Sequence, residues 1–146
     1  MLISTRGRYA LRIMIDLAEH INGSFIPTKD IAERQEISLK YMEKIMTMLS
    51  KSGLVEGAHG KGGGYRLYRA PDEYKVGDIL RVTEGSLSPV SCLESGAEPC
   101  NRISQCKTLP MWKKLDSLIN GFLDSITLAD LMANNTADDY VIYKGM

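Results

Sequence analysis

The 146-residue chain lacks any long apolar run. No stretch approaches the roughly 18 apolar residues that a membrane-spanning helix needs. The first twenty residues carry a charge every few positions, and they have neither the apolar centre nor the small-residue cleavage site of a signal peptide. We therefore expect a cytoplasmic protein that does not bind a membrane. With 44% hydrophobic and 25% charged residues, the chain has the composition of a globular protein that buries a core.

Histidine and cysteine are scarce. The two histidines, His20 and His59, are far in sequence from the three cysteines, which all lie between Cys92 and Cys106. A cysteine nucleophile needs a base beside it, so this pattern does not favour an enzyme. Structural disulfides are rare in the cytoplasm, and three thiols would leave one unpaired. The cysteines therefore favour metal or redox chemistry, and a loop that carries thiols without a ligand is the alternative.

The net charge is zero, but the charges are unevenly distributed. Residues 1–75 carry twelve Lys/Arg against nine Asp/Glu, whereas residues 76–146 carry six against nine. The basic excess is largest in one segment, which contains Lys40, Lys44, Lys51, Lys61, Arg66 and Arg69 against Glu43 and Glu56. A local basic surface on a neutral protein points to an anionic partner.

A helix-turn-helix is predicted in the first third of the chain. Residues 5–21 form a preceding amphipathic helix, with apolar side chains at helical spacing: Tyr9, Ala10, Ile13, Met14, Leu17, Ala18 and Ile21. Thr28 is the expected N-cap of a short helix, and residues 36–37 form a tight turn. The next helix extends from a Ser38 cap to Gly53. Two helices joined by so short a turn form a helix-turn-helix.

The second helix of this pair has two distinct faces. Its apolar stripe is expected to pack on the core and consists of Leu39, Met42, Ile45, Met46 and Leu49. Its outward face carries Lys40, Tyr41, Lys44, Thr47 and Lys51. A recognition helix needs this arrangement, because its apolar back holds it in place while long donors enter the major groove. An ordinary surface helix with solvated lysines is the alternative.

Residues 54–70 predict a β-hairpin, since a glycine-rich turn is followed by residues that alternate with a period of two. A Walker-type phosphate loop needs Ser or Thr after Gly-Lys, but Gly62 follows Lys61. A basic hairpin directly after a helix-turn-helix is a wing, and its tip with His59 can reach a phosphate or the minor groove. The predicted DNA contacts are Thr28, Lys29, Ser38, Lys40, Tyr41, Lys44, His59 and Lys61.

A long helix is predicted to begin near Thr108 and Pro110. Its apolar residues recur at spacings of three and four: Trp112, Leu115, Ile119, Phe122 and Ile126. This stripe favours docking on a partner helix, and packing on its own domain is the alternative. Thr127 and Asp130 predict a capping box at the start of the next helix. The tail from residue 135 is polar and then aromatic, and its pattern indicates no role.

The chain resembles the IscR-type family of bacterial winged-helix regulators in five segments, which follow in the family's order: STRGRYALRIMIDLA, IAERQEISLKYMEKIMTMLSKSGLV, GKGGGYRL, VGDILRVTEG and LDSITLADL. The resemblance implies a homodimeric transcription factor in which a long C-terminal helix forms the dimer. It also implies an iron–sulfur cluster, held by three cysteines placed just after Glu84-Gly85. Cys92, Cys100 and Cys106 occupy those positions.

The resemblance leaves the fourth cluster ligand open. The cysteines are separated by seven and then five residues, whereas the family's archetype has equal gaps. The archetype's fourth ligand is a histidine at the position of Leu109, and other relatives use first-helix residues at the positions of Arg8 and Arg12. Glu94, Glu98, a backbone group or a small thiol remain as candidates. A 2Fe–2S cluster is favoured over a 4Fe–4S cluster.

Two other interpretations of the cysteines stay open. The segment EGSLSPV before Cys92 resembles a cluster-free, CymR-like branch of the family, whose archetype controls cysteine metabolism through a partner enzyme. A zinc ion held by the three cysteines and one further ligand is also consistent with the sequence, which does not separate zinc from iron.

We therefore expect a mostly α fold with a small β-hairpin. The predicted parts are a winged helix-turn-helix domain (1–84, with the helix-turn-helix at about 28–52 and the wing at about 54–70), a cysteine-bearing loop (85–107), dimerisation helices (108–134) and a tail (135–146). The expected function is that of a homodimeric repressor, which binds a palindromic operator in double-stranded DNA with an affinity set by an iron–sulfur cluster.

Overall fold

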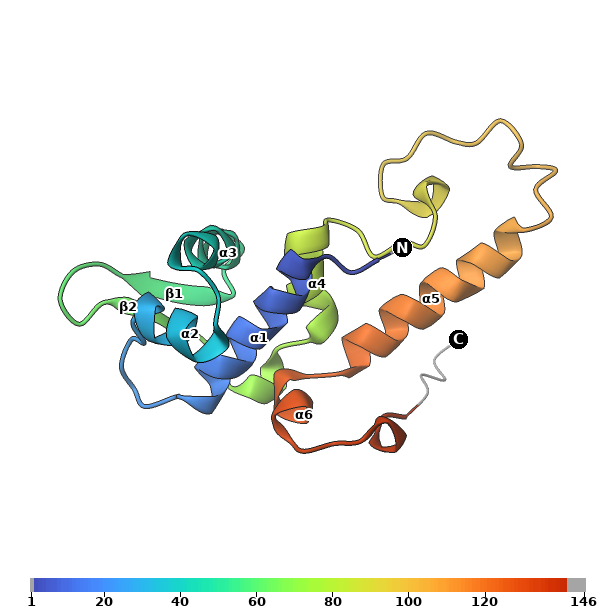
Figure 1. Cartoon of the computed structure of the whole chain (residues 1–146). Coiled ribbons are helices and arrows are strands. Elements are labelled where there is room, and N and C mark those ends of the chain that lie inside the picture. Colours follow the sequence, from blue (N-terminus) through green and yellow to red (C-terminus); the bar gives the residue numbers. More distant parts are fainter. Residues whose placement is uncertain (1, 142–146) are drawn as a thin grey trace.

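Six α-helices and one β-hairpin make up the described structure, a computed structural model that covers residues 2–141 (Figure 1). The helices are α1 (Thr5–Glu19), α2 (Thr28–Gln35), α3 (Leu39–Lys51), α4 (Val76–Glu84), α5 (Leu109–Ser125) and α6 (Leu128–Met132). The strands are β1 (Val55–Ala58) and β2 (Gly64–Leu67), and single 3-10 turns occur at Pro71–Glu73, Ser91–Leu93 and Ala137–Asp139. The predicted mostly α fold with a small hairpin is confirmed.

Helix α1 is the centre of the core, because it packs against α2, α3, α4, α6 and β2. Its side chains Ile13 and Met14 are fully buried. They share one apolar cluster with Ile45 of α3, Ile79 of α4 and Leu128 of α6. Burying each such side chain contributes roughly 1.5–3 kcal/mol. Because Leu128 belongs to this cluster, the C-terminal part of the chain completes the core of the N-terminal half.

The pairing of α1 with α2 depends on a buried carboxylate. Asp16 is 1% exposed, and it accepts hydrogen bonds from Nε and Nη2 of Arg34 at 3.0 and 2.7 Å and from Nε2 of Gln35 at 2.9 Å. Burial raises the pKa of Asp16, but the hydrogen bonds and the charge of Arg34 outweigh burial and lower the pKa below its ordinary value. Arg12 donates to the side-chain and backbone oxygens of Gln35, so α2 is tied to α1 at two places.

The turn between α2 and α3 matches its prediction. Glu36 has a left-handed φ of 54°. Ser38 caps α3, since its Oγ accepts a hydrogen bond from Tyr41 N at 3.2 Å. Gly53 follows the end of α3 with a φ of 74°, a conformation that glycine adopts without strain.

The predicted N-cap of α2 is wrong. Pro27 is the N-cap, and Thr28 is the first helical residue, without a side-chain cap hydrogen bond. The physical reason is a backbone bridge between Ile26 and Tyr65. Pro27 follows this bridge directly, and its fixed φ suits the entry to a helix. Helix α2 therefore begins at Thr28, one residue earlier than predicted.

Two apolar residues of the predicted helix stripes are exposed. Ile21 is 57% exposed, because α1 ends at Glu19 and Ile21 lies in the following loop. Leu39 is 48% exposed, because it is the first residue of α3 and lies at the edge of the helix's buried face.

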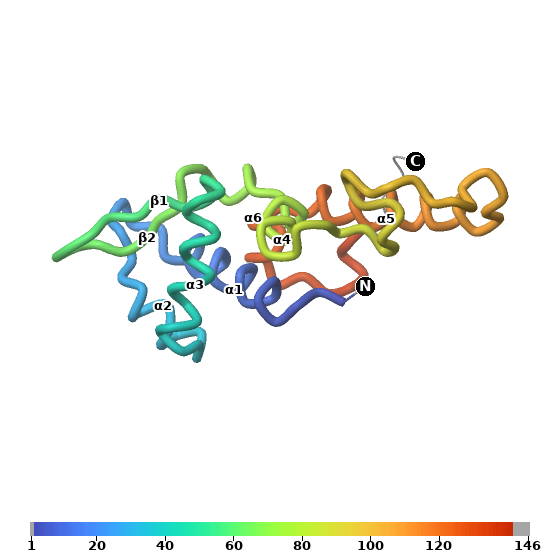
Figure 2. The backbone as a smooth tube through the Cα atoms, turned by 90° about the horizontal axis from the view of Figure 1, so that it is seen from above, coloured from blue at the N-terminus to red at the C-terminus, as the bar shows by residue number. Residues whose placement is uncertain are grey.

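The predicted hairpin is confirmed as an antiparallel pair of β1 and β2, with Val55 opposite Leu67. Ile26 extends the pair, since its backbone exchanges hydrogen bonds of 2.8 and 2.9 Å with Tyr65. A Cβ on Gly64 would clash with the Ile26 backbone, so this close approach requires glycine. The hairpin projects at one end of the molecule, and the loop after α4 lies at the other (Figures 1 and 2).

Tyr74 fixes the base of the hairpin. Its hydroxyl donates to Leu54 O at 2.9 Å and accepts from the backbone N–H groups of Tyr68 and Arg69 at 3.0 and 3.3 Å. Its ring is fully buried. The buried Tyr74 therefore ties both ends of the hairpin to the core.

The C-terminal end of α5 is attached to α4. Val76 N donates to Ile126 O at 2.8 Å. Arg81 binds both carboxylate oxygens of Asp124, at 2.8 and 3.0 Å, and also Oδ1 of Asn120 at 2.8 Å. The two helices are therefore fixed to each other where α5 ends.

The apolar stripe of α5 divides into two halves. Ile126 is only 8% exposed and belongs to a core cluster of its own chain, against which Ile119 and Phe122 pack partly. The N-terminal half projects away from the winged body (Figure 1), and Met111 and Leu115 are 53% and 37% exposed. Within residues 2–141, no side chain of α5 is fully buried. Own-domain packing therefore explains the C-terminal half of the stripe only.

The segment after α5 follows its prediction in part. The Thr127–Asp130 capping box is confirmed at the start of α6. The tail returns to α5, where Tyr140 packs edge-on against Phe122 with ring centroids 6.5 Å apart. Residues 142–146 of the predicted tail lie outside the described residues.

Asp16→Asn is expected to destabilise the fold by about 2 kcal/mol at pH 7, because it removes charge-assisted hydrogen bonds that tie α2 to α1. The folded-state pKa of Asp16 is lowered, so its contribution is present above the unfolded pKa of about 4 and is lost as pH falls through the folded value. Urea unfolding from pH 7 to pH 3 checks this.

The difference in unfolding free energy between wild type and Asp16→Asn should shrink on acidification. Asp138→Asn, at an exposed position in the tail, is the control. A difference that stays constant across this pH range would contradict the assignment.

Candidate nucleic-acid interface and cysteine loop

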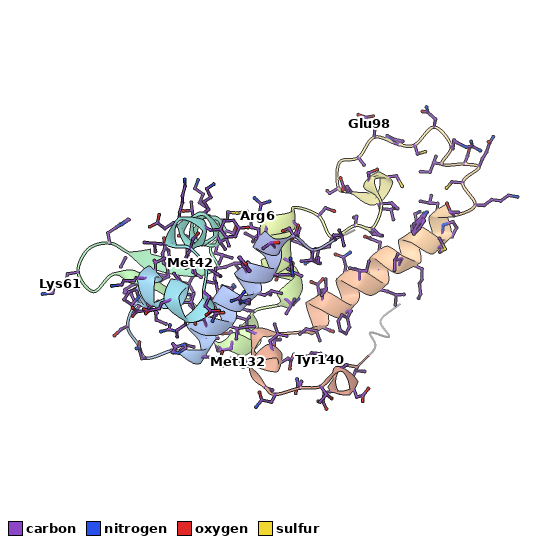
Figure 3. The ribbon with its side chains drawn as sticks, in the orientation of Figure 1. Arg6, Met42, Lys61, Glu98, Met132 and Tyr140 are labelled. Atoms are coloured by element: carbon purple, nitrogen blue, oxygen red, sulfur yellow. The ribbon has the colours of Figure 1, made fainter. Side chains whose placement is uncertain are left out.

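An open groove of about 690 Å³ lies between α3 and the hairpin. Its walls come from the start of α2, from α3 and from the hairpin turn, and they include the predicted contacts Thr28, Lys29 and His59. Lys61 projects from the far tip of the hairpin (Figure 3). The fold therefore brings together the three parts of a winged helix-turn-helix that approach DNA.

The predicted contacts on α3 and at its cap lie outside this groove. Lys40 and Ser38 are exposed at the N-terminal end of α3. Tyr41 and Lys44 line a separate recess of about 360 Å³, together with Arg6 from α1. The half-buried ring of Tyr41 packs edge-on against Tyr9 of α1, with centroids 5.7 Å apart. This second recess adds the N-terminal end of α1 to the candidate surface.

The groove also contains residues that were not among the predicted contacts. Leu39, Glu43 and Thr47 lie one helical turn apart along the wall that α3 contributes. Thr47 Oγ1 donates to Glu43 O at 2.8 Å. The spacing of four residues is the sequence signal that could have predicted this row. Leu39 was instead predicted to pack on the core, because it is apolar. An exposed leucine at this position offers apolar contact to a base-pair edge.

Two cationic side chains of the basic segment, Arg66 and Arg69, contact other residues of the fold and do not line the groove. Arg66 pairs with Glu56 at 3.1 Å and lies 4.2 Å from the ring centroid of Phe25. Arg69 lies 4.6 Å from the ring centroid of Tyr74. These contacts fix the wing, so the basic character of the candidate surface comes from its lysines and from Arg6.

The three cysteines lie on the long loop between α4 and α5, and all are free thiols. Cys92 and Cys100 are exposed, and Cys106 is partly exposed. All three line one pocket of about 250 Å³, together with Glu98 and Lys113. The loop lies at the end of the molecule opposite the wing, and Figure 3 labels Glu98 on it.

Cys106 lies at the start of α5, with its Sγ 3.4 Å from Thr108 Oγ1. Hydrogen bonds from the Thr108 side chain and from the backbone N–H groups of Thr108 and Leu109, with the charge of Arg102, lower the pKa of the Cys106 thiol. This environment favours the thiolate, which is the form that binds metals.

The cysteine loop fits a cluster in its donor chemistry but is not closed around one. Thiolates are soft ligands that suit iron–sulfur clusters. Within residues 2–141, no three histidine, cysteine or acidic side chains are gathered closely enough to hold a metal ion. Binding therefore requires the loop to close, so that its ordering is coupled to ligation.

The loop begins where α4 meets the N-terminal end of α1. The carboxylate of Glu84 accepts hydrogen bonds from Ser4 N at 2.9 Å and from Ser4 Oγ at 2.6 Å. Arg6 donates to Thr83 O at 3.4 Å. Since Arg6 also borders the recess with Tyr41 and Lys44, α1 connects the cysteine loop to the candidate DNA surface.

A helix-turn-helix followed by a wing, with exposed lysines on its second helix, defines a class of DNA-binding transcriptional regulators. Within this class, the chain belongs to the Rrf2 family, described as iron-dependent transcriptional regulators, whose sequence profile matches residues 3–134. The resemblance to IscR-type regulators is therefore confirmed.

Relatives of known name support this family assignment. The chain is 42% identical over 135 residues to the HTH-type transcriptional regulator IscR of Aliivibrio salmonicida, a match that covers 92% of this chain and 79% of the relative. It is 40% identical over 134 residues to IscR of Serratia proteamaculans, covering 92% and 80%. The relatives are named as transcriptional regulators, so the chain is a DNA-binding regulator and not an enzyme.

Solved structures with the same fold agree. CymR, the global cysteine regulator of B. subtilis, superposes with a TM-score of 0.74 at 37% identity, covering 93% of this chain and 99% of that one. IscR of T. potens superposes with a TM-score of 0.68 at 35% identity, covering 97% of both chains. None of the helices in the described part of the chain is long and apolar enough to cross a bilayer.

Replacing Lys40 and Lys44 by alanine is expected to weaken binding to every DNA sequence, because each lysine removed leaves a phosphate without its cation. The slope of log affinity against log salt should fall by about one for each such phosphate. Fluorescence anisotropy over a salt series measures both effects. Lys75→Ala is the control, because Lys75 is exposed before α4, beside Thr127. An unchanged slope in the double variant would reject the outward face of α3 as the DNA-binding surface.

Proposed function

We propose that this chain is a homodimeric repressor that binds a palindromic operator, and that an iron–sulfur cluster on Cys92, Cys100 and Cys106 sets its affinity for DNA. One observation carries the cluster proposal: the three thiols of the chain line a single pocket on the loop that joins the winged body to α5. The iron-dependent description of the family supports the same proposal.

The DNA-binding part of the proposal rests on the groove between α3 and the wing. The exposed end of α3, with Lys40, would enter the major groove, while Glu43 and Thr47 meet base edges from the groove wall. The start of α2, with Lys29, would meet a phosphate. His59 and Lys61 would reach the backbone or the adjacent minor groove from the hairpin turn.

The dimer part of the proposal rests on the N-terminal half of α5. Within residues 2–141, Met111 and Leu115 in this half stay exposed beside the partly exposed Trp112. A second copy of α5 would bury these side chains in a helix pair. Two recognition helices related by a twofold axis then match a palindromic site.

The regulatory part of the proposal rests on the position of the loop. When bound, an iron–sulfur cluster supplies a redox-sensitive group whose presence depends on iron. The cysteines would hold it as thiolates, and the lowered pKa of the Cys106 thiol, just before α5, makes that thiolate easier to form. Drawing the loop together would change the angle between α5 and the winged body, and so the separation of the two recognition helices. A 2Fe–2S cluster is the proposed type.

A second candidate function is a cluster-free regulator that acts through a partner enzyme. The similarity to CymR favours it, because that match extends over 99% of the CymR chain. Within residues 2–141, the three thiols do not form a group that could hold a metal ion, which is also consistent with this candidate.

Leu115→Glu is expected to dissociate the dimer, because it would place an unpaired charge in the helix pair at a penalty of roughly 2 kcal/mol or more. Affinity for a palindromic site should fall accordingly, since each half-site binds weakly alone. Sedimentation and operator binding measure the two effects. Ser117→Glu, at an exposed position of the same helix, is the control. A monomeric wild type with full operator affinity would refute the dimer.

Protein purified without oxygen is expected to be brown and to contain iron and acid-labile sulfide. Alanine at Cys92, Cys100 or Cys106 should each abolish the colour, because two thiols leave a cluster half-coordinated. Operator affinity should differ between the loaded and unloaded wild type. Protein that stays colourless after anaerobic reconstitution, with operator binding identical in the triple-alanine variant, would reject the cluster and favour the partner-enzyme candidate.

A further inference from the structure

Three cysteines leave one coordination position of the proposed cluster without a protein ligand. The positions that supply it in similar regulators do not supply it in this chain. Leu109 contributes an apolar wall to the cysteine pocket. Arg8 bonds to Thr5 Oγ1 at 2.9 Å, and Arg12 is engaged with Gln35. A cationic guanidinium has no lone pair for iron in any case.

The cysteine pocket itself offers one further donor. Besides the three cysteines, the residues with polar side chains among those that line it are Glu98 and Lys113. The other residues that line this pocket are apolar and have no side-chain atom that binds iron. Glu94, the other acidic residue of the same loop, lies outside the lining. The path of the loop thus distinguishes two carboxylates that the sequence alone leaves equivalent.

From this arrangement we infer that the carboxylate of Glu98 is the fourth protein ligand of the cluster. The inference rests on the proposed cluster and specifies its ligand set as three thiolates and one carboxylate. Glu98 precedes Cys100 by two residues, so closure of the loop that brings in the Cys100 thiolate carries Glu98 with it. Lys113, in the same lining, offsets part of the negative charge that four anionic ligands introduce.

The chemistry of this ligand set has a functional consequence. A carboxylate oxygen is a harder ligand than a thiolate and suits iron less well than sulfur does. Glu98 is also exposed on the surface of the loop. The fourth position is therefore the one at which a small molecule would displace the protein ligand first.

The experiment compares Glu98→Gln with Glu94→Gln, which removes the same charge from the same loop outside the pocket. Both variants and the wild type are reconstituted anaerobically, and the iron and sulfide content, visible circular dichroism and rate of cluster loss to an iron chelator are measured. Glu98→Gln should lose its cluster roughly tenfold faster than the wild type, whereas Glu94→Gln should match the wild type. Glu98→Cys should retain a cluster with an altered dichroism spectrum, because a thiolate replaces the oxygen.

Equal loss rates for Glu98→Gln and Glu94→Gln, or an unchanged spectrum for Glu98→Cys, would overturn the assignment of Glu98 and leave the proposed function intact. A wild type that takes up no cluster would overturn both. Far-UV circular dichroism and DNA binding of the unloaded variants should equal those of the unloaded wild type, which shows that the substitutions act on the cluster and not on the fold.

Discussion

The attachment of α5 to α4 is the constraint on which the rest of the structure depends. Arg81 binds the Asp124 carboxylate through two nitrogens, and the backbone bond between Val76 and Ile126 continues the contact. At Gly77, a Cβ would meet the Asp124 carboxylate, so a larger residue would displace that carboxylate from its position beside Arg81. Within residues 2–141, the contacts that fix α5 to the winged body lie at this end, so its other end is where the cysteine loop and the proposed partner subunit would set its position.

The cysteine loop connects the C-terminal end of α4 to the N-terminal end of α5, the end of α5 that lies away from the Arg81–Asp124 contact. It begins at the end of α4, which Glu84 fixes to Ser4 of α1, and it ends at Cys106 beside the start of α5. In the proposed function, closure of this loop on the cluster would draw its two ends together and change the angle between α4 and α5 at the Arg81–Asp124 contact. Helix α1 packs on α4 and also on α2 and α3, so the α4 side of this contact is joined to the candidate DNA-binding surface.

Local signals in the sequence predicted most of the fold, whereas contacts between distant segments account for the errors. The Ser38 cap, the turn at Glu36 and the hairpin depend on a few neighbouring residues, and their patterns predicted them. The N-cap of α2 depends on a bridge between Ile26 and Tyr65, which no short pattern reveals. The same holds for Ile126, whose burial depends on α4. The cysteines predicted a site by composition, but the difference between Glu94 and Glu98 depends on the path of the loop.

The distance between the two recognition helices in the proposed dimer tests the proposed coupling of the cysteine loop to DNA binding most directly. A spin label on a non-cysteine unnatural residue at Lys51, which is exposed on α3, leaves all three thiols available. Pulsed dipolar spectroscopy of the anaerobic dimer, before and after removal of the cluster, measures the distance between the two labels. We expect two different distances, with the separation in the DNA-binding form near one helical turn of DNA, about 34 Å. The same distance in the loaded and unloaded dimers would contradict the coupling.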